Sequence, residues 1–181
     1  MEPPYDTNKL NRLMDKAGID LILAHTPHNI RYLTGGYYFH FRERITAIGP
    51  SQYLPFVGIP KGDTTRAFQV AWLVEACPYN KIEDWIPDIV HTKARGTVGA
   101  AQIAAKAIRN RGLTKATIGI ERAFMPADAM DMLREELPEA HFVESFNTLD
   151  HRVPLLSLGN VFDSTELKAW HTRAARLLGD D

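Results

Sequence analysis

The sequence has a single cysteine, Cys77, among its 181 residues. One cysteine cannot form an internal disulfide, and the start MEPPYD lacks the positive region and apolar stretch of a secretion signal. No apolar run approaches the roughly 20 residues that a membrane-spanning helix needs. These absences predict a cytoplasmic protein that does not insert into a membrane.

The chain also lacks an excess of charge of either sign. Its 21 Lys and Arg residues balance 22 Asp and Glu residues, which leaves a net charge of -1. A nucleic-acid-binding protein usually carries a basic patch or stripe, so nucleic acid is not expected as a partner. Apolar residues make up 45% of the chain, which is ordinary for a folded globular protein.

Several catalytic motifs are missing as well. There is no G-x-S-x-G elbow, no Walker loop and no G-x-G-x-x-G. His25 and His28 suggest a metal site, but the stretch HTPHNIRYLTGG around them contains no Cys, Asp or Glu to complete the ligand set. Cys77 has no evident base partner and is expected to be a small apolar residue. We therefore expect neither catalytic residues nor a bound metal within this chain.

The hydrophobic pattern predicts alternating strands and helices. Thr26 followed by Pro27 is typical of a helix start, and Gly35 of its end. Ile82, Ile86 and Ile89 have helical spacing, which predicts a helix over 82–91 that Pro87 would interrupt. Other helices are expected at 7–17, 97–111, 126–137 and 163–177, besides 27–34, and strands at 19–24, 44–49, 53–58, 67–74, 116–121 and 141–145. This order predicts a three-layer α/β/α domain around a mixed sheet.

The segment GGYYFHFRER, residues 35–44, sets aromatic residues beside His40, Arg42 and Arg44. Arginine can hold a carboxylate with two parallel hydrogen bonds, so the segment suits a small substrate with an apolar body and a carboxylate. Two other interpretations remain open. The aromatic residues could fill the core beside solvated charges, or the segment could belong to a protein interface.

Several stretches together resemble one known family. RLMDKAGIDLILAHTPHNIRYLTGG is followed by FRER, TIGIE and REELPEAHFVES, and the chain closes with STELKAWHTRAAR. This order resembles the N-terminal domain of the creatinase, prolidase and aminopeptidase P family over nearly the whole chain. NIRYLTGG is the most specific piece, since it matches the family signature Asn-Ile-x-Tyr-Leu-Thr-Gly from Asn29 to Gly35.

The resemblance implies a two-domain enzyme of which this chain is one part. Residues 1–160 would form the creatinase/prolidase N-terminal-like domain, and 161–181 would begin the helix that connects to a C-terminal pita-bread catalytic domain. In peptidase members that second domain holds a pair of divalent metals with two Asp, one His and two Glu. The resemblance therefore implies that this chain is inactive alone and that the full protein is a metal-dependent hydrolase, an Xaa-Pro dipeptidase or aminopeptidase.

The resemblance further implies a homodimer. In the family, the segment after the signature approaches the active site of the partner subunit, and the corresponding residues here are His40, Phe41, Arg42 and Arg44, together with Glu43. One departure concerns the linker, where HRVPLLSLGNVFDSTELK is longer than the family pattern and has Asp163 in place of a Lys. Two alternatives remain: a creatinase-like C–N hydrolase, and a free-standing module for small-ligand binding or dimerisation.

Overall fold

The computed structural model describes residues 2–35, 54–72, 85–92 and 96–145, all within one compact unit, Met1–Asp150. Its helices are α1 (Thr7–Ala17), α2 (Pro27–Thr34), α4 (Gly96–Asn110), α5 (Ala127–Glu136) and the short 3-10 helix η2 (Thr64–Arg66). Its strands are β1 (Leu21–Ala24), β2 (Phe56–Pro60), β3 (Phe68–Trp72), β4 (Asp88–Thr92), β5 (Thr117–Ile120) and β6 (His141–Glu144).

The strands form one mixed sheet in the order β4-β3-β2-β1-β5-β6. β1 pairs with β2 in antiparallel and with β5 in parallel orientation, and β2 pairs with β3 in antiparallel orientation. The outer strands β4 and β6 each run parallel to their neighbour. The mixed sheet that the sequence pattern predicts is therefore confirmed.

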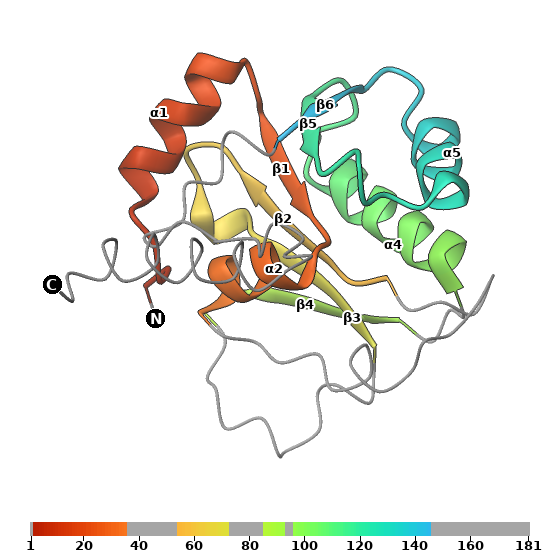
Figure 1. Ribbon diagram of the computed structural model, residues 1–181, viewed down its shortest axis with the longest axis horizontal. Helices are drawn as coiled ribbons and strands as arrows, with labels where there is room; N and C mark the ends of the chain where they lie inside the picture. Colours follow the sequence, from red (N-terminus) through yellow and green to blue (C-terminus); the bar gives the residue numbers. More distant parts are fainter. Residues whose placement is uncertain (1, 36–53, 73–84, 93–95, 146–181) are drawn as a thin grey trace, which may run out of the picture. The chain divides into compact units, whose positions relative to one another are not determined.

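Helices cover both faces of this sheet (Figure 1). Leu21 and Leu23 of β1 belong to the core cluster under α4 and α5, whereas Ile22 and Ala24 belong to the cluster under α1 and α2. Side chains alternate between the two faces of a strand, so a central strand covered on both sides must be apolar throughout. The three-layer α/β/α prediction is confirmed.

Most predicted elements form close to their expected bounds, with one clear error. Asp6 caps α1 by accepting a hydrogen bond from the Lys9 backbone N–H, and Gly18 ends the helix in the left-handed conformation. The predicted helix over 82–91 is wrong for its described part, because Asp88–Thr92 forms strand β4 beside β3. Pairing with a strand supplies the backbone hydrogen bonds that Pro87 denies to a helix.

The packing inside the sheet depends on one glycine. Gly58 of β2 lies opposite Phe68 of β3, and a Cβ atom at Gly58 would come within 2.0 Å of the Phe68 ring. The ring therefore lies over a position where only glycine leaves room.

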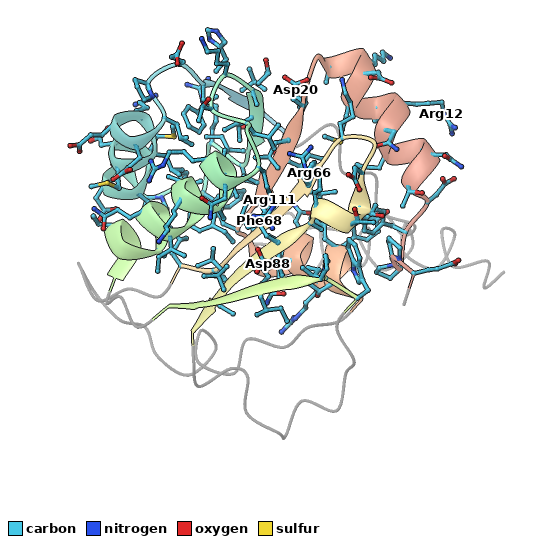
Figure 2. The ribbon with its side chains drawn as sticks, turned by 180° about the vertical axis from the view of Figure 1, so that it is seen from behind. Arg12, Asp20, Arg66, Phe68, Asp88 and Arg111 are labelled. Carbon is cyan, nitrogen blue, oxygen red and sulfur yellow. The ribbon has the colours of Figure 1, made fainter. Side chains whose placement is uncertain are left out.

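The C-terminal end of α4 is joined to the sheet by Arg111 (Figure 2). Its guanidinium group lies 4.5 Å from the centroid of the Phe68 ring. It also donates to the Asp88 carboxylate at 2.7 Å and to the Arg66 carbonyl at 2.7 Å. Phe68 belongs to β3, Asp88 to β4 and Arg66 to the end of η2. The Arg111 side chain therefore connects the end of α4 to three elements that precede it in the sequence.

Three predicted features lie outside the described residues: the strand at 44–49, Cys77 and the helix at 163–177. The proposed division at residue 160 also stays a prediction. Within the described ranges, none of the helices is both long and apolar enough to cross a membrane.

The cluster under α1 and α2 contains a buried phenol. Tyr5 is 6% exposed, stacks on Tyr32 at a centroid distance of 5.9 Å and meets Trp85 edge-on. Burial, assisted by the neighbouring Tyr32, raises the pKa of Tyr5 above its ordinary value of 10.0. Above about pH 10, the folded protein therefore keeps the Tyr5 proton that the unfolded chain releases.

We predict that stability falls as the pH rises above about 10, partly through Tyr5. The unfolded state binds fewer protons there, so its free energy drops relative to the native state. Urea unfolding of the wild type and of Tyr5→Phe at pH 7 and at pH 11 checks this. Tyr5→Phe should lose less stability between the two pH values than the wild type; equal losses would contradict the prediction.

Candidate functional site

The stretch HTPHNIRYLTGG begins at the end of β1, directly beside the end of β5. β1 and β5 are parallel neighbours, and their carboxyl ends lead to opposite faces of the sheet: β1 into α2 and β5 into the loop before α5. This is a topological switch point, the place where open α/β sheets commonly bind ligands. It is therefore the first place to look for a functional site.

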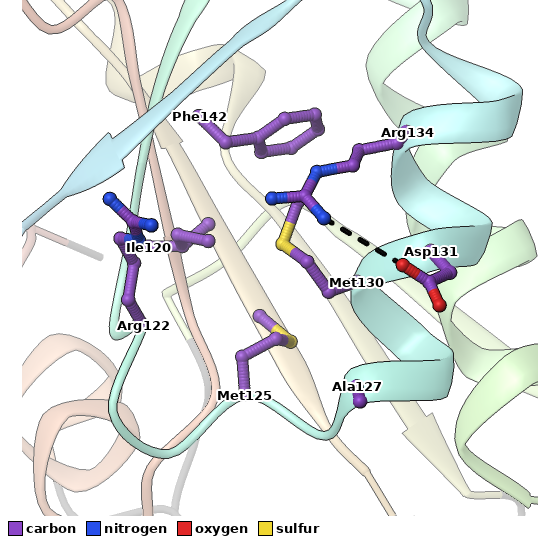
Figure 3. Close-up of a pocket in the computed structure, with 8 residues that line it drawn as sticks. All are labelled: Ile120, Arg122, Met125, Ala127, Met130, Asp131, Arg134 and Phe142. Carbon is purple, nitrogen blue, oxygen red and sulfur yellow. Dashed lines mark ion pairs between the residues drawn. The ribbon is translucent and has the colours of Figure 1, made fainter.

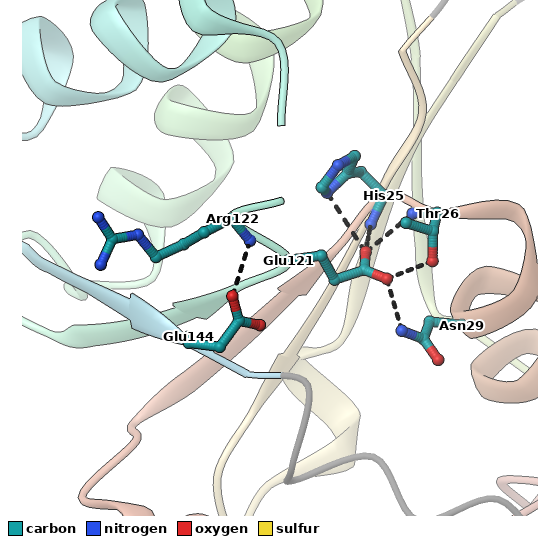
Figure 4. A network of polar contacts seen from close by, with 6 residues as sticks. All are labelled: His25, Thr26, Asn29, Glu121, Arg122 and Glu144. Atoms are coloured by element: carbon teal, nitrogen blue, oxygen red, sulfur yellow. Dashed lines mark hydrogen bonds and ion pairs between the residues drawn. The ribbon is translucent and has the colours of Figure 1, made fainter. Parts of the chain in front are cut away.

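A carboxylate of the protein itself occupies this position (Figure 4). Glu121, which follows β5 directly, is 1% exposed. Its Oε2 accepts hydrogen bonds from the backbone N–H groups of His25 at 2.7 Å and Thr26 at 2.8 Å. Its Oε1 accepts from the Thr26 hydroxyl and from the Asn29 side-chain amide. Two backbone and two side-chain donors thus converge on one carboxylate.

This arrangement places negative charge at the N-terminus of α2. The first N–H groups of a helix have no partner inside the helix and carry partial positive charge, so anions are favoured there. Burying a carboxylate is costly, and hydrogen bonds to its charged form offset that cost. We conclude that Glu121 acts as an internal anion that joins β5 to the turn before α2.

Thr26 takes the N-cap position that the sequence predicts, but its side chain does not cap the helix. Its hydroxyl donates to Glu121 instead of accepting from a backbone N–H of α2. Ile30 and Leu33 point inward as predicted, and both are fully buried. The helix ends at Gly35, which has a φ of 79°.

His25 and His28 do not form a metal site together. The His25 ring is fully buried, with its Nδ1 3.3 Å from Glu121 Oε2 and its ring near Phe56. His28 is exposed. Within the part of the chain that the structure describes, no group of three or more His, Cys, Asp or Glu side chains could hold a metal ion.

The residues predicted to contact substrate lie beyond the described ranges. His40, Phe41, Arg42 and Arg44 belong to residues 36–53, as does Glu43. The prediction for them stands untested. Their segment follows directly on α2, and the N-terminus of α2 is held by Glu121.

The sequence pattern did not identify Glu121 as a site residue, because TIGIE predicts only a strand. A signal was present, because a glutamate follows directly on a strand whose inward residues are Ile118 and Ile120. An acidic residue at the carboxyl end of a buried parallel strand is a candidate for a switch-point site.

The fold and this site define a three-layer α/β/α domain with a mixed sheet and a closed switch point. The model of the Creatinase/Prolidase N-terminal domain matches residues 7–151. The chain therefore belongs to the Creatinase/Prolidase N-terminal domain family.

Solved structures share this fold. The N-terminal domain of the cytoplasmic peptidase PepQ from Mycobacterium tuberculosis is 17% identical, with a TM-score of 0.53 over 78% of this chain and 93% of that one. The N-terminal domain of an X-Pro dipeptidase from Streptococcus pyogenes is 16% identical, with a TM-score of 0.52 over 77% and 94%. The Xaa-Pro dipeptidase from Bacillus anthracis is 19% identical, with a TM-score of 0.52 over 77% of this chain. Our chain covers 33% of the length of that dipeptidase.

Curated DNA ligases match only a short segment. The enzyme from Thermomicrobium roseum is 53% identical over 36 residues, and that from Parasynechococcus marenigrum is 54% identical over 33 residues. These matches cover 18–20% of this chain and 5% of each ligase. Segments below about 40 residues rarely fold alone, so the matches carry no assignment of ligase activity.

We predict that Glu121→Gln lowers the free energy of unfolding by about 2–4 kcal/mol, because the glutamine amide would face N–H donors that then lack an acceptor. Glu139→Gln is the matched control, since Glu139 forms an exposed ion pair with Lys115 at 2.7 Å. That change should cost under about 1 kcal/mol. Urea unfolding followed by circular dichroism measures both. Equal losses would show that Glu121 does not have the structural role described.

Proposed function

We propose that this chain is the non-catalytic N-terminal domain of a metal-dependent hydrolase that resembles Xaa-Pro dipeptidase and aminopeptidase P. One observation carries the proposal: the chain aligns with nearly the full length of separate N-terminal domains from such peptidases, but with one third of a whole dipeptidase. The remaining part of the enzyme would supply the chemistry. We place the protein in the cytoplasm.

The metal pair expected in peptidase members does not fit the described residues, because no suitable cluster of ligands exists among them. The proposal therefore assigns the metals to a C-terminal pita-bread domain. No catalytic step is assigned to a side chain of this chain.

The closed switch point supports a scaffolding role. Where an open α/β sheet would bind a ligand between β1 and β5, Glu121 is already held by four hydrogen-bond donors. The same contacts fix the start of α2. Since residues 36–44 follow α2 directly, a fixed helix gives this segment a defined starting point.

We further propose that the protein is a homodimer and that residues 40–44 shape the substrate entrance of the partner subunit. His40, Phe41, Arg42 and Arg44 are the residues proposed to contact substrate there. An aromatic ring and a guanidinium group suit a peptide or small molecule with an apolar body and a carboxylate. Because the same chemistry suits creatine-like molecules, a creatinase-like C–N hydrolase is the alternative, and a free-standing binding or dimerisation module is the second.

The first test is to read the coding sequence beyond codon 181. The full-length product and the 181-residue chain are then each assayed against Xaa-Pro dipeptides with added divalent metal. We expect a following segment with two Asp, one His and two Glu, turnover by the full product and none by the 181-residue chain. Creatine serves as the comparison substrate for the creatinase-like alternative. Turnover by the 181-residue chain alone, or a stop codon at 182, would overturn the proposal.

For the full product, we predict that Arg42→Gln or Arg44→Gln raises KM for an Xaa-Pro dipeptide about tenfold or more. A charge-assisted hydrogen bond contributes about 1.5–3 kcal/mol, which corresponds to that range. Arg12→Gln, on the exposed surface of α1, is the control and should leave KM unchanged. Steady-state kinetics check this; unchanged KM in both segment variants would remove residues 40–44 from the substrate entrance.

A further inference from the structure

A second feature at the carboxyl end of β5 has no role in the proposed function. The chain continues from Glu121 to Arg122, and these two side chains point away from each other (Figure 4). Glu121 reaches the turn before α2, whereas Arg122 lines a hollow beside α5. One side of this strand end is therefore filled by the protein itself, and the other side is open.

The hollow has a volume of about 230 Å³. Its wall is partly apolar, with side chains from β5, the loop after it, α5 and β6 (Figure 3). These are Ile120, Met125, Met130 and Phe142. Pockets for drug-sized ligands measure about 300–1,000 Å³, so this hollow suits a group the size of one amino-acid residue.

Two guanidinium groups face the same space. Arg134 reaches across it from α5, and its ion pair with Asp131 is loose, with Nη1 and Oδ1 3.7 Å apart and both side chains more than half exposed (Figure 3). The Arg122 guanidinium makes no hydrogen bond or ion pair with any described residue. Its backbone N–H donates to Glu144 at 3.2 Å, which holds the residue at the strand end. Each guanidinium carries five N–H donors, so most of this donor capacity is available to a ligand.

A second hollow, at the opposite end of the sheet, also has cationic side chains, but these are paired within the protein. It is lined by Lys61, Arg66 and Lys115 among others. Lys61 is paired with Asp15 and Asp20, Lys115 with Glu139, and the Arg66 guanidinium with the Arg111 carbonyl. Cations that already have partners in the protein are poor candidates for holding a ligand.

We propose that the hollow between β5 and α5 binds a carboxylate carried on an apolar body the size of one residue. Arg122 and Arg134 hold the carboxylate, and the two methionines and Phe142 contact the body. With Asp131 on the wall, the lining has a net single positive charge, which the charge of one carboxylate balances. Phosphate has no apolar body to contact the methionines and Phe142, so it should bind more weakly. The same chemistry is offered by a free N-acyl amino acid and by the C-terminal residue of a peptide.

The test is a titration of the ¹⁵N-labelled 181-residue chain followed by NMR. The probes are N-acetyl-leucinate, the neutral N-acetyl-leucinamide, inorganic phosphate and the peptide acetyl-Ala-Ala-Leu. We expect saturable shifts at Arg122, Met125 and Ala127 with N-acetyl-leucinate, and weaker binding of the amide and of phosphate. If the peptide binds more tightly than N-acetyl-leucinate, the ligand is a peptide C-terminus. If the two bind equally, the ligand is a free small molecule. Either result supports the site.

Three variants and a matched control test whether the arginines and the hollow bind the ligand. Arg122→Gln and Arg134→Gln should each weaken binding of N-acetyl-leucinate about twofold to fivefold, the range of an exposed ion pair. Ala127→Phe should abolish binding by filling the hollow. Arg12→Gln removes a charge from α1 that is also exposed, and it should change nothing. The proposal fails if no saturable shift occurs, if the amide or phosphate binds as well, or if Arg12→Gln weakens binding as much as Arg134→Gln.

Discussion

The buried carboxylate of Glu121 is the interaction on which the arrangement around β1 and β5 depends. α2 has eight residues, and helices this short are marginal in water without tertiary support. Glu121 provides that support at the N-terminus, where the Thr26 side chain does not cap the helix. Because the donors come from the turn after β1 and the acceptor from the end of β5, the contact also joins two strands that are almost 100 residues apart in the chain.

The two sides of the β5 end therefore have different properties. Toward α2, the buried Glu121 carboxylate is held by four hydrogen-bond donors of the protein, which favours a rigid scaffold. Toward α5, Arg122 and Arg134 are exposed beside a partly apolar wall. A rigid element beside an open, charged hollow is a common arrangement for binding sites, because the scaffold keeps the contact groups in place.

Much of the fold could be predicted from the sequence, because the elements depend on local patterns. The helix start at Thr26 and Pro27, the helix end at Gly35 and the strand at 19–24 were all predicted correctly. The segment around Ile86 and Ile89 was misread, since its apolar spacing is helical while pairing with β3 decides the strand. For the candidate site, the sequence singled out HTPHNIRYLTGG as a helix start, two histidines without further ligands and a family signature, but it did not reveal the partner of this stretch, Glu121.

The sequence by itself determined most helix and strand positions and the apolar run that buries β1 on both faces. These follow from periodicity and turn chemistry, which act over a few residues. The family was indicated by the resemblance of several stretches, above all NIRYLTGG. Only the tertiary structure decided that His25, Thr26 and Asn29 share Glu121 as their partner. It alone also decided that Arg122 and Arg134 line one hollow. Such contacts depend on which strands become neighbours, and strand order is a property of the whole sheet that no local pattern encodes.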